Sequence, residues 1–115
     1  MKIANQHVSA SFKTKGAELI SLVKDNQEYL WQANPKHWGR HAPILFPVVG
    51  KLKNDQFTVD GVEYPMSQHG FARDKEFEIE KHNSDSITFI LKSDAETLKV
   101  YPFKFELRIC YELIN

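Results

Sequence analysis

Two short segments of this chain concentrate the side chains that could do chemistry. They are residues 38–50 and residues 69–73. Each mixes glycine or proline with aromatic residues and cations, without the regular apolar spacing of a helix or a strand. An imidazole can donate or accept a proton near neutral pH, and a guanidinium offers a fork of donors to hydroxyl groups or to phosphate. Such segments on a strand-rich scaffold are suited to a sugar site.

His69 is the strongest candidate for chemistry among the five histidines, because Gly70 follows it and allows a ligand or another backbone segment to come close. A neutral imidazole can serve a sugar hydroxyl as donor or as acceptor. The alternative is a loop histidine bonded to a backbone carbonyl, and the residue types leave both interpretations open. The histidines lack zinc-site spacing and Cys110 is the single cysteine, so we predict no metal site.

Arg40 and Arg73 are the next candidates, as donors to vicinal hydroxyls or to a phosphate. Local sequence favours the alternative that each forms a surface ion pair, for example Arg73 with Asp74. Trp38 is the best candidate for an apolar platform under a sugar ring, since it lies inside the irregular segment. The other aromatic residues considered, which are more typical of a core, are Trp31, Phe46 and Phe71.

The scaffold that positions these residues is predicted by apolar residues at every second position, which is typical of half-buried strands. Strands are expected at residues 8–13, 17–22, 28–31, 56–59, 62–64, 75–81, 87–91 and 103–113. Asp60-Gly61 predicts a tight hairpin between two of them. A capping box at Ser93 and Glu96 predicts a helix of one or two turns that ends before Pro102. With no alternation of strands and helices, the fold class is all-β, an antiparallel β-sandwich.

Composition narrows the classes of partner. The chain has 115 residues, enough for one domain, and 15 Lys and Arg balance 15 Asp and Glu. A net charge of zero argues against nucleic acid or an anionic membrane surface as the main partner. No apolar run is long enough to span a bilayer, and the first residues lack the apolar core of a signal peptide. A cytoplasmic location is therefore expected.

The last predicted strand, residues 103–113, carries apolar side chains along one face and lies at the end of the sequence. Its pairing partner either comes earlier in the sequence or belongs to a longer protein of which this chain is the front part. We predict that one edge of this strand is free in the chain alone. A long free edge also leaves open self-association into a homo-oligomer.

These segments together carry a family resemblance. Residues 34–50, the Asp60-Gly61 hairpin, residues 69–73 and Tyr101-Pro102-Phe103 resemble the N-terminal portion of the aldose 1-epimerase family, in a branch found in lactose-catabolic operons. The resemblance implies a galactose mutarotase-like supersandwich, with residues 1–115 as a single domain at its N-terminal end. It also implies interconversion of the α and β anomers of an aldose or a phosphorylated aldose.

The resemblance assigns roles to three residues, and residue chemistry adds two more. In the family, a glutamate takes the proton of the anomeric hydroxyl and a histidine protonates the ring oxygen, so that the ring opens. An earlier histidine, which binds substrate and helps to stabilise the ring oxygen, matches His69. Lys51 falls where the family has an arginine, and Arg40 precedes the apolar run expected near the sugar. Arg73 and Trp38 complete the predicted cleft. The acid histidine and the base glutamate are expected outside the 115 residues, and no cofactor is implied.

Two other functions remain open from the sequence. One is a non-catalytic module that binds or senses a sugar on the same sandwich. The other is a structural domain that pairs through its last strand. The sequence does not distinguish a free sugar from a sugar phosphate.

Overall fold

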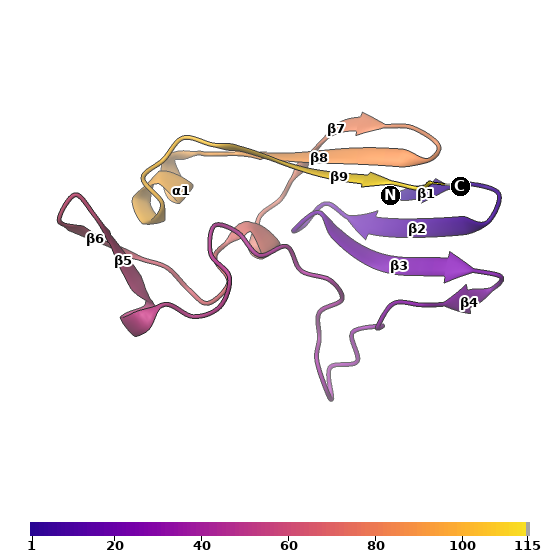
Figure 1. Cartoon of the computed structure of the whole chain (residues 1–115), viewed down its shortest axis with the longest axis horizontal. Helices are drawn as coiled ribbons and strands as arrows, with labels where there is room; N and C mark the ends of the chain where they lie inside the picture. Colours follow the sequence, from indigo (N-terminus) through magenta and orange to yellow (C-terminus); the bar gives the residue numbers. More distant parts are fainter. Residues whose placement is uncertain (115) are drawn as a thin grey trace.

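The computed structural model describes residues 1–114 and contains two antiparallel sheets that pack face to face, with a separate hairpin at one end (Figure 1). One sheet has the order β1-β2-β3-β4, the other has the order β7-β8-β9, and the hairpin is β5-β6. The strands are β1 Lys2–Ala4, β2 Val8–Lys13, β3 Glu18–Lys24, β4 Gln27–Glu28, β5 Gln56–Val59, β6 Val62–Pro65, β7 Glu78–His82, β8 Ser86–Lys92 and β9 Glu106–Glu112. The predicted all-β antiparallel class is confirmed.

The core lies between the two sheets. Ile3 and Phe12 of the first sheet are buried against Ile87 and Phe89 of the second. The ring of Phe12 lies 5.9 Å from that of Phe89 and 4.5 Å from that of Tyr111, centroid to centroid. Alternate side chains of a strand point to the same face, so these strands bury one face and leave the other in water. Each such side chain contributes about 1.5–3 kcal/mol by leaving water.

The short elements follow local signals, with one displacement. Asp60 and Gly61 both have positive φ, 47° and 79°, as the predicted hairpin turn requires. Helix α1 spans Ala95–Val100, but its cap is Asp94, whose carboxylate accepts the backbone N–H of Thr97. The prediction of a Ser93–Glu96 box was therefore wrong by one residue, because Ser93 Oγ accepts the N–H of Phe105 instead. Among the described residues, no helix combines the length and apolar composition that crossing a membrane requires.

Several strand ends differ from prediction. Strand β7 begins at Glu78, three residues later than expected, because the N–H of Phe77 donates to the oxygen of Thr14, which follows β2 of the other sheet. Strand β3 continues to Lys24.

The strand expected at residues 28–31 is reduced to β4, because the Glu28 carboxylate accepts the N–H groups of Leu22 and Leu30 and turns the chain out of the ladder. Strand β9 begins at Glu106, three residues later than expected. Within the part of the chain that the structure describes, β9 pairs with β8 alone, so the predicted free edge is present. Strand β1 was not anticipated.

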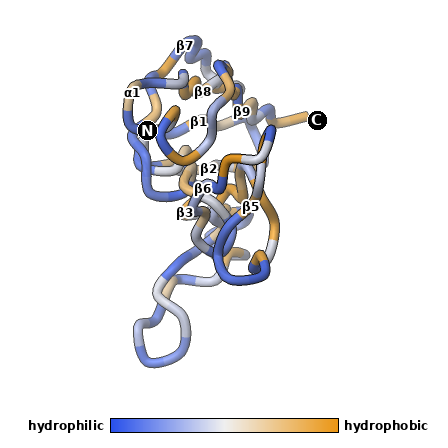
Figure 2. Tube along the Cα trace, turned by 90° about the vertical axis from the view of Figure 1, so that its left-hand side faces the viewer, coloured by the Kyte–Doolittle hydropathy of each residue, from blue (hydrophilic) through white to orange (hydrophobic). Residues whose placement is uncertain are grey.

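A long loop between β4 and the short 3₁₀ turn η1 (Lys53–Asp55) projects away from both sheets (Figure 1). Figure 2 colours its tip mostly hydrophilic. Asn34 shapes this tip, since its backbone oxygen accepts the N–H groups of His37 and Trp38. The second 3₁₀ turn, η2, spans Ala72–Asp74 and overlaps the end of the segment of residues 69–73. The loop and η2 carry the candidate site.

Candidate functional site

Trp38, Arg40 and Arg73 meet at one open cavity, although they come from two segments far apart in the sequence. The cavity has a volume of about 460 Å³, which is within the range of small-molecule sites. Its other lining residues are Lys13, Lys15, Gly39 and Asp74. Four cations therefore face a single carboxylate here, and the arrangement favours a ligand with hydroxyl or anionic oxygens.

The two arginines are held differently. Arg40 Nη2 donates to Asp74 Oδ1 over 2.9 Å, and both side chains are partly exposed, so the pair adds little stability. Arg73 is the more buried, and its Nη2 donates to the backbone oxygen of Gln68 over 2.9 Å. Its Nε is buried and has no hydrogen-bond partner. Arg73 Nε lies 4.0 Å from Asp74 Oδ2, so the ion-pair interpretation holds for both arginines, and the Gln68 backbone holds Arg73 in addition.

Glu18 is a positioning residue that the sequence analysis missed. Its side chain is 1% exposed, and Oε1 accepts the N–H groups of His41 and Ala42 over 2.9 and 3.0 Å. Lys13 pairs with the other carboxylate oxygen. These bonds fasten the segment that follows Arg40 to the first sheet. One signal in the sequence could have identified Glu18: it lies on the same face of the predicted strand as Ile20 and Leu22. A carboxylate on an apolar face is buried with them, and a buried charge requires partners.

Glu18 remains ionised at neutral pH. Burial by itself raises the pKa of this carboxyl, but the hydrogen bond from Lys13, the N–H groups of His41 and Ala42, and the charge of Lys13 lower it by more. The net effect is a pKa below the ordinary glutamate value. A charged, fully partnered carboxylate is therefore the anchor of this side of the cavity.

His69 lies in the adjoining loop, where it is tied to Gly50 by two hydrogen bonds. The N–H of His69 donates to the oxygen of Gly50 over 2.9 Å, and the N–H of Gly50 donates to Nδ1 of His69 over 2.8 Å. A backbone N–H can only donate, so Nδ1 is the acceptor and the neutral ring carries its hydrogen on Nε2. Gln68 Nε2 lies 3.4 Å from His69 Nε2, but it is also a donor and so cannot accept the hydrogen of His69 Nε2. The Nε2 hydrogen is thus available to a ligand.

Gly70 joins the two chemical segments. It pairs with Phe46 in a parallel bridge, and the N–H groups of Phe71 and Ala72 both donate to the Phe46 oxygen. Gly70 has a φ of 73°, and a Cβ there would overlap the carbonyl of Phe46 and the nitrogen of Pro47. The close approach expected at this glycine is observed, and the approaching group is backbone.

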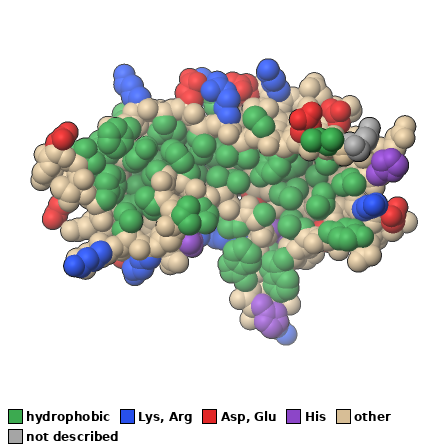
Figure 3. Space-filling model, in the orientation of Figure 1, with side chains coloured by type: hydrophobic (Ala, Val, Ile, Leu, Met, Phe, Trp, Pro, Cys, Tyr) green, Lys and Arg blue, Asp and Glu red, His purple; other side chains and the backbone are tan. Residues whose placement is uncertain are grey.

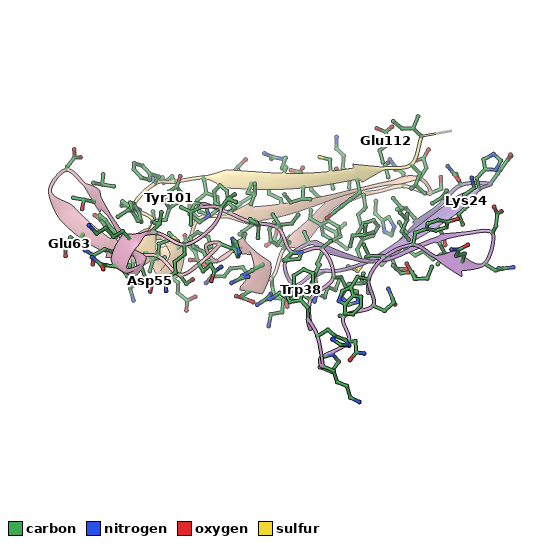
Figure 4. All side chains as sticks on the ribbon, turned by 60° about the horizontal axis from the view of Figure 1, so that its bottom comes forward. Lys24, Trp38, Asp55, Glu63, Tyr101 and Glu112 are labelled. Carbon is green, nitrogen blue, oxygen red and sulfur yellow. The ribbon has the colours of Figure 1, made fainter. Side chains whose placement is uncertain are left out.

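The five predicted site residues do not line one shared cleft. Lys51 is exposed, with Nζ 3.6 Å from Asp55 Oδ2, and neither it nor His69 lines the cavity of Trp38 and Arg40. In Figure 4, Trp38 lies on the projecting side, away from the end that carries Asp55. The bond from the Arg73 guanidinium to the Gln68 backbone connects the two parts. The roles of all five residues in binding stay predictions.

Two further placements complete the site. Trp38 is 49% exposed, and its backbone oxygen accepts the indole N–H of Trp31. Phe46 and Phe71 pack edge to face against each other and both contact the core cluster, as expected of core aromatics. Trp31, also expected in the core, is 43% exposed because it lies on the projecting loop, so that expectation was wrong. Among residues 1–114, no group of three or more His, Cys, Asp or Glu side chains is arranged to hold a metal ion.

The whole chain, residues 1–115, matches the aldose 1-epimerase family. It therefore belongs to that family, which confirms the resemblance carried by residues 34–50 and 69–73. Protein LacX (plasmid) of Lactococcus lactis subsp. lactis is 43% identical over 119 residues, a match that covers 98% of this chain and 40% of that protein.

Solved structures of galactose mutarotase-like proteins have the same fold as this chain. The chain is similar to the galactose mutarotase related enzyme from Lactobacillus acidophilus, with a TM-score of 0.98, 51% identity and coverage of 100% of this chain and 39% of that one. A galactose mutarotase-like protein from Lactobacillus casei has a TM-score of 0.97 and 44% identity, over 100% of this chain and 40% of that one. The fold is galactose mutarotase-like, and the chain spans about two-fifths of the length of these relatives.

Proposed function

We propose that this chain carries the sugar-binding part of an aldose 1-epimerase site, which interconverts the α and β anomers of an aldose by acid/base ring opening. Family membership supports the reaction class. The observation that carries the proposal is the bond from the Gly50 N–H to His69 Nδ1, since it leaves the Nε2 hydrogen of a neutral imidazole for a ligand. A neutral donor of this kind suits the ring oxygen of a sugar.

Each candidate residue has a role in this proposal. His69 donates to the ring oxygen and stabilises charge as the ring opens. Arg40 and Arg73 bind hydroxyl or phosphate oxygens, with Lys51 as a further cation beside the His69 loop. Trp38 lies against the apolar face of the sugar. The base glutamate and the second histidine are supplied from outside these 115 residues.

A non-catalytic sugar-binding module is the second candidate. The observation that favours it is the cavity of Arg40 and Arg73, because its cations can bind sugar oxygens without any proton transfer. Losing one of two cooperating proton-transfer groups slows a reaction on the order of 10²–10⁴-fold. The chain alone is therefore expected to bind sugar without efficient turnover under either function.

Anomer-exchange NMR separates the candidates. Galactose, glucose and glucose 6-phosphate are each mixed with the purified chain, and then with a chimera in which this chain replaces the matched segment of LacX. We expect broadened sugar lines with the chain alone and anomer exchange above the spontaneous rate with the chimera. Broadening without faster exchange in both samples would favour the binding module. Unbroadened lines in both samples would overturn both functions.

We also place the protein in the cytoplasm, with a small-molecule sugar or sugar phosphate as its ligand. Cys110 is exposed and free, which suits a reducing compartment. Fractionation of cells that express the protein with its native flanking sequence tests the location.

A further inference from the structure

Asp74 lies between the two arginines of the charged cavity. Its Oδ1 accepts a hydrogen bond from Arg40 Nη2 over 2.9 Å, and its Oδ2 lies 4.0 Å from Arg73 Nε. Among the described residues that line the cavity, Asp74 is the one that carries a carboxylate, and the other charged side chains there are all cations. One residue therefore supplies the side-chain acceptor oxygens in a cavity of donors.

The second carboxylate oxygen of Asp74 is open to a ligand. A separation of 4.0 Å is too long for a hydrogen bond, so Arg73 attracts Oδ2 by charge without donating to it. Within residues 1–114, Oδ2 accepts no hydrogen bond, and the Asp74 side chain is 53% exposed. A hydroxyl group that enters the cavity therefore finds an acceptor beside two guanidinium groups.

The backbone that carries this carboxylate is held in place by the first sheet. The N–H of Gly16, which precedes β3, donates to the oxygen of Lys75 over 2.8 Å. The N–H of Asp74 donates to the oxygen of Phe71 over 3.0 Å within η2. The bond from Arg40 then joins η2 to the projecting loop. The acceptor and its neighbouring donors are thus positioned before a ligand binds, which lowers the entropic cost of binding.

A sugar hydroxyl and a phosphate differ in how they fit this arrangement. A hydroxyl both donates and accepts, so one hydroxyl of a vicinal pair can donate to Asp74 Oδ2 while its neighbour accepts from a guanidinium. A phosphate dianion has only acceptor oxygens, so it gains nothing from the carboxylate. It would also place like charges side by side, which is a common way for a site to reject a competing ligand.

The charge that remains for an anion is smaller than the four cations suggest. Lys13 is paired with the buried carboxylate of Glu18, and Arg40 is paired with Asp74. Lys15 is exposed, so water and salt screen its charge. The face seen in Figure 3 carries its Lys and Arg side chains mainly at the margin, around a hydrophobic band, and adds no broad field of cations.

We infer that Asp74 is the specificity-determining residue of this cavity, and that it selects the hydroxyl groups of a free aldose over the phosphate oxygens of an aldose phosphate. The inference rests on the proposed function, since it assigns the ligand of the same site. Asp74 contacts the ligand directly, as the acceptor for one hydroxyl. The two arginines serve as donors to the neighbouring hydroxyl, with Arg40 still held by Oδ1.

The test compares glucose with glucose 6-phosphate, each titrated by NMR into the purified chain. We expect wild type to bind glucose at least as tightly as glucose 6-phosphate. In Asp74→Asn, the ratio of the Kd for glucose to the Kd for glucose 6-phosphate should rise about fivefold. Inorganic phosphate, which has no sugar hydroxyls, should bind the variant more tightly than wild type by a similar factor.

Two further variants separate the role of the carboxylate from net charge and from folding. Asp74→Glu keeps the carboxylate and should stay near the wild-type ratio. Asp85→Asn makes the same change in net charge at an exposed turn between β7 and β8, and it should leave the ratio unchanged. Thermal unfolding of each variant shows whether a change in binding follows from a loss of structure.

The possible failures are distinguishable. An unchanged ratio in Asp74→Asn, or a wild type that prefers glucose 6-phosphate, would overturn the inference and leave the proposed function standing. Equal effects of Asp74→Asn and Asp85→Asn would also overturn it, because net charge would then explain the change. Absence of binding by either sugar to wild type and to every variant would overturn the proposed function, and the inference with it.

Discussion

Two hollows of the molecule, with volumes of about 460 and 320 Å³, have opposite chemistry. The cavity of Trp38, Arg40 and Arg73 is rimmed by cations, whereas the groove of Phe57 and Phe103 is wholly apolar. Cations remain hydrated when their site is empty, so a ligand can enter and leave. An exposed apolar groove costs about 25 cal/mol for each Å² left in water, which favours a permanent cover. The difference separates a hydrated, charged surface from one whose exposure to water costs free energy.

One backbone joint connects the two hollows. Phe46 accepts the N–H of Ala72, the residue before Arg73 of the charged cavity, and the residues after Phe46, Pro47 and Val48, line the groove. Damage at the joint should therefore affect both regions, while changes within either region should affect that one alone. The following variants test this, from the largest expected effect to the smallest.

Gly70→Ala should disturb both regions at once. The new Cβ would overlap the Phe46 carbonyl, and the φ of 73° is unfavourable for alanine. We expect a loss of about 3 kcal/mol or more in the free energy of unfolding, measured with urea. Gly39→Ala is the matched control, since its Cβ would meet no atom within 4 Å. A similar loss in both variants would show that the close contact between Gly70 and Phe46 does not determine stability.

Glu18→Gln should weaken the charged cavity and leave the groove intact. The amide cannot replace the ion pair with Lys13, so we expect a loss of about 1–3 kcal/mol at neutral pH. Because the folded-state pKa of Glu18 lies below its ordinary value of 4.5, the stabilisation is present above that value and disappears as the pH falls through the folded pKa. The difference in the free energy of unfolding between the wild type and Glu18→Gln should become smaller as the pH falls. If urea unfolding gave the same difference at every pH below neutral, Glu18 would not be an ionised, partnered carboxylate.

His69→Asn should reduce sugar binding and preserve the fold. Asparagine tolerates the positive φ of 65° and can accept the Gly50 N–H in place of Nδ1, but it lacks the Nε2 donor. We expect sugar affinity to fall about tenfold, as for one lost hydrogen bond, with unfolding nearly unchanged. His69→Ala, which leaves the Gly50 N–H unpaired, should lose stability as well. Unchanged affinity in His69→Asn, measured by NMR titration, would assign His69 a purely structural role.

Asp74→Asn should produce the smallest change. It removes the partly exposed ion pairs with Arg40 and Arg73, so stability should shift by about 1 kcal/mol or less. The freed guanidinium should improve binding of glucose 6-phosphate relative to glucose, and the gain should shrink at high salt. A gain that is equal for both sugars, or insensitive to salt, would argue against a charge-based cavity.

Much of the scaffold was predictable because its signals are local. The alternation in β2 and β8, the Asp60-Gly61 turn and the close approach at Gly70 each depend on a few neighbouring residues. Strand ends were less predictable, since a single side chain such as Glu28 can replace the ladder bonds that would extend β4.

The sequence by itself determined the fold class, the family and the residue types of the candidate site. Only the tertiary structure decided how they are grouped: it brought Arg40 and Arg73 to one cavity and placed Lys51 and His69 outside its lining. It also revealed Glu18, whose backbone partners lie 23 and 24 residues away along the chain. Sequence periodicity reports which face a residue is expected to take. It carries no information on which distant N–H will meet a buried carboxylate, because that depends on how the sheets and loops pack in space.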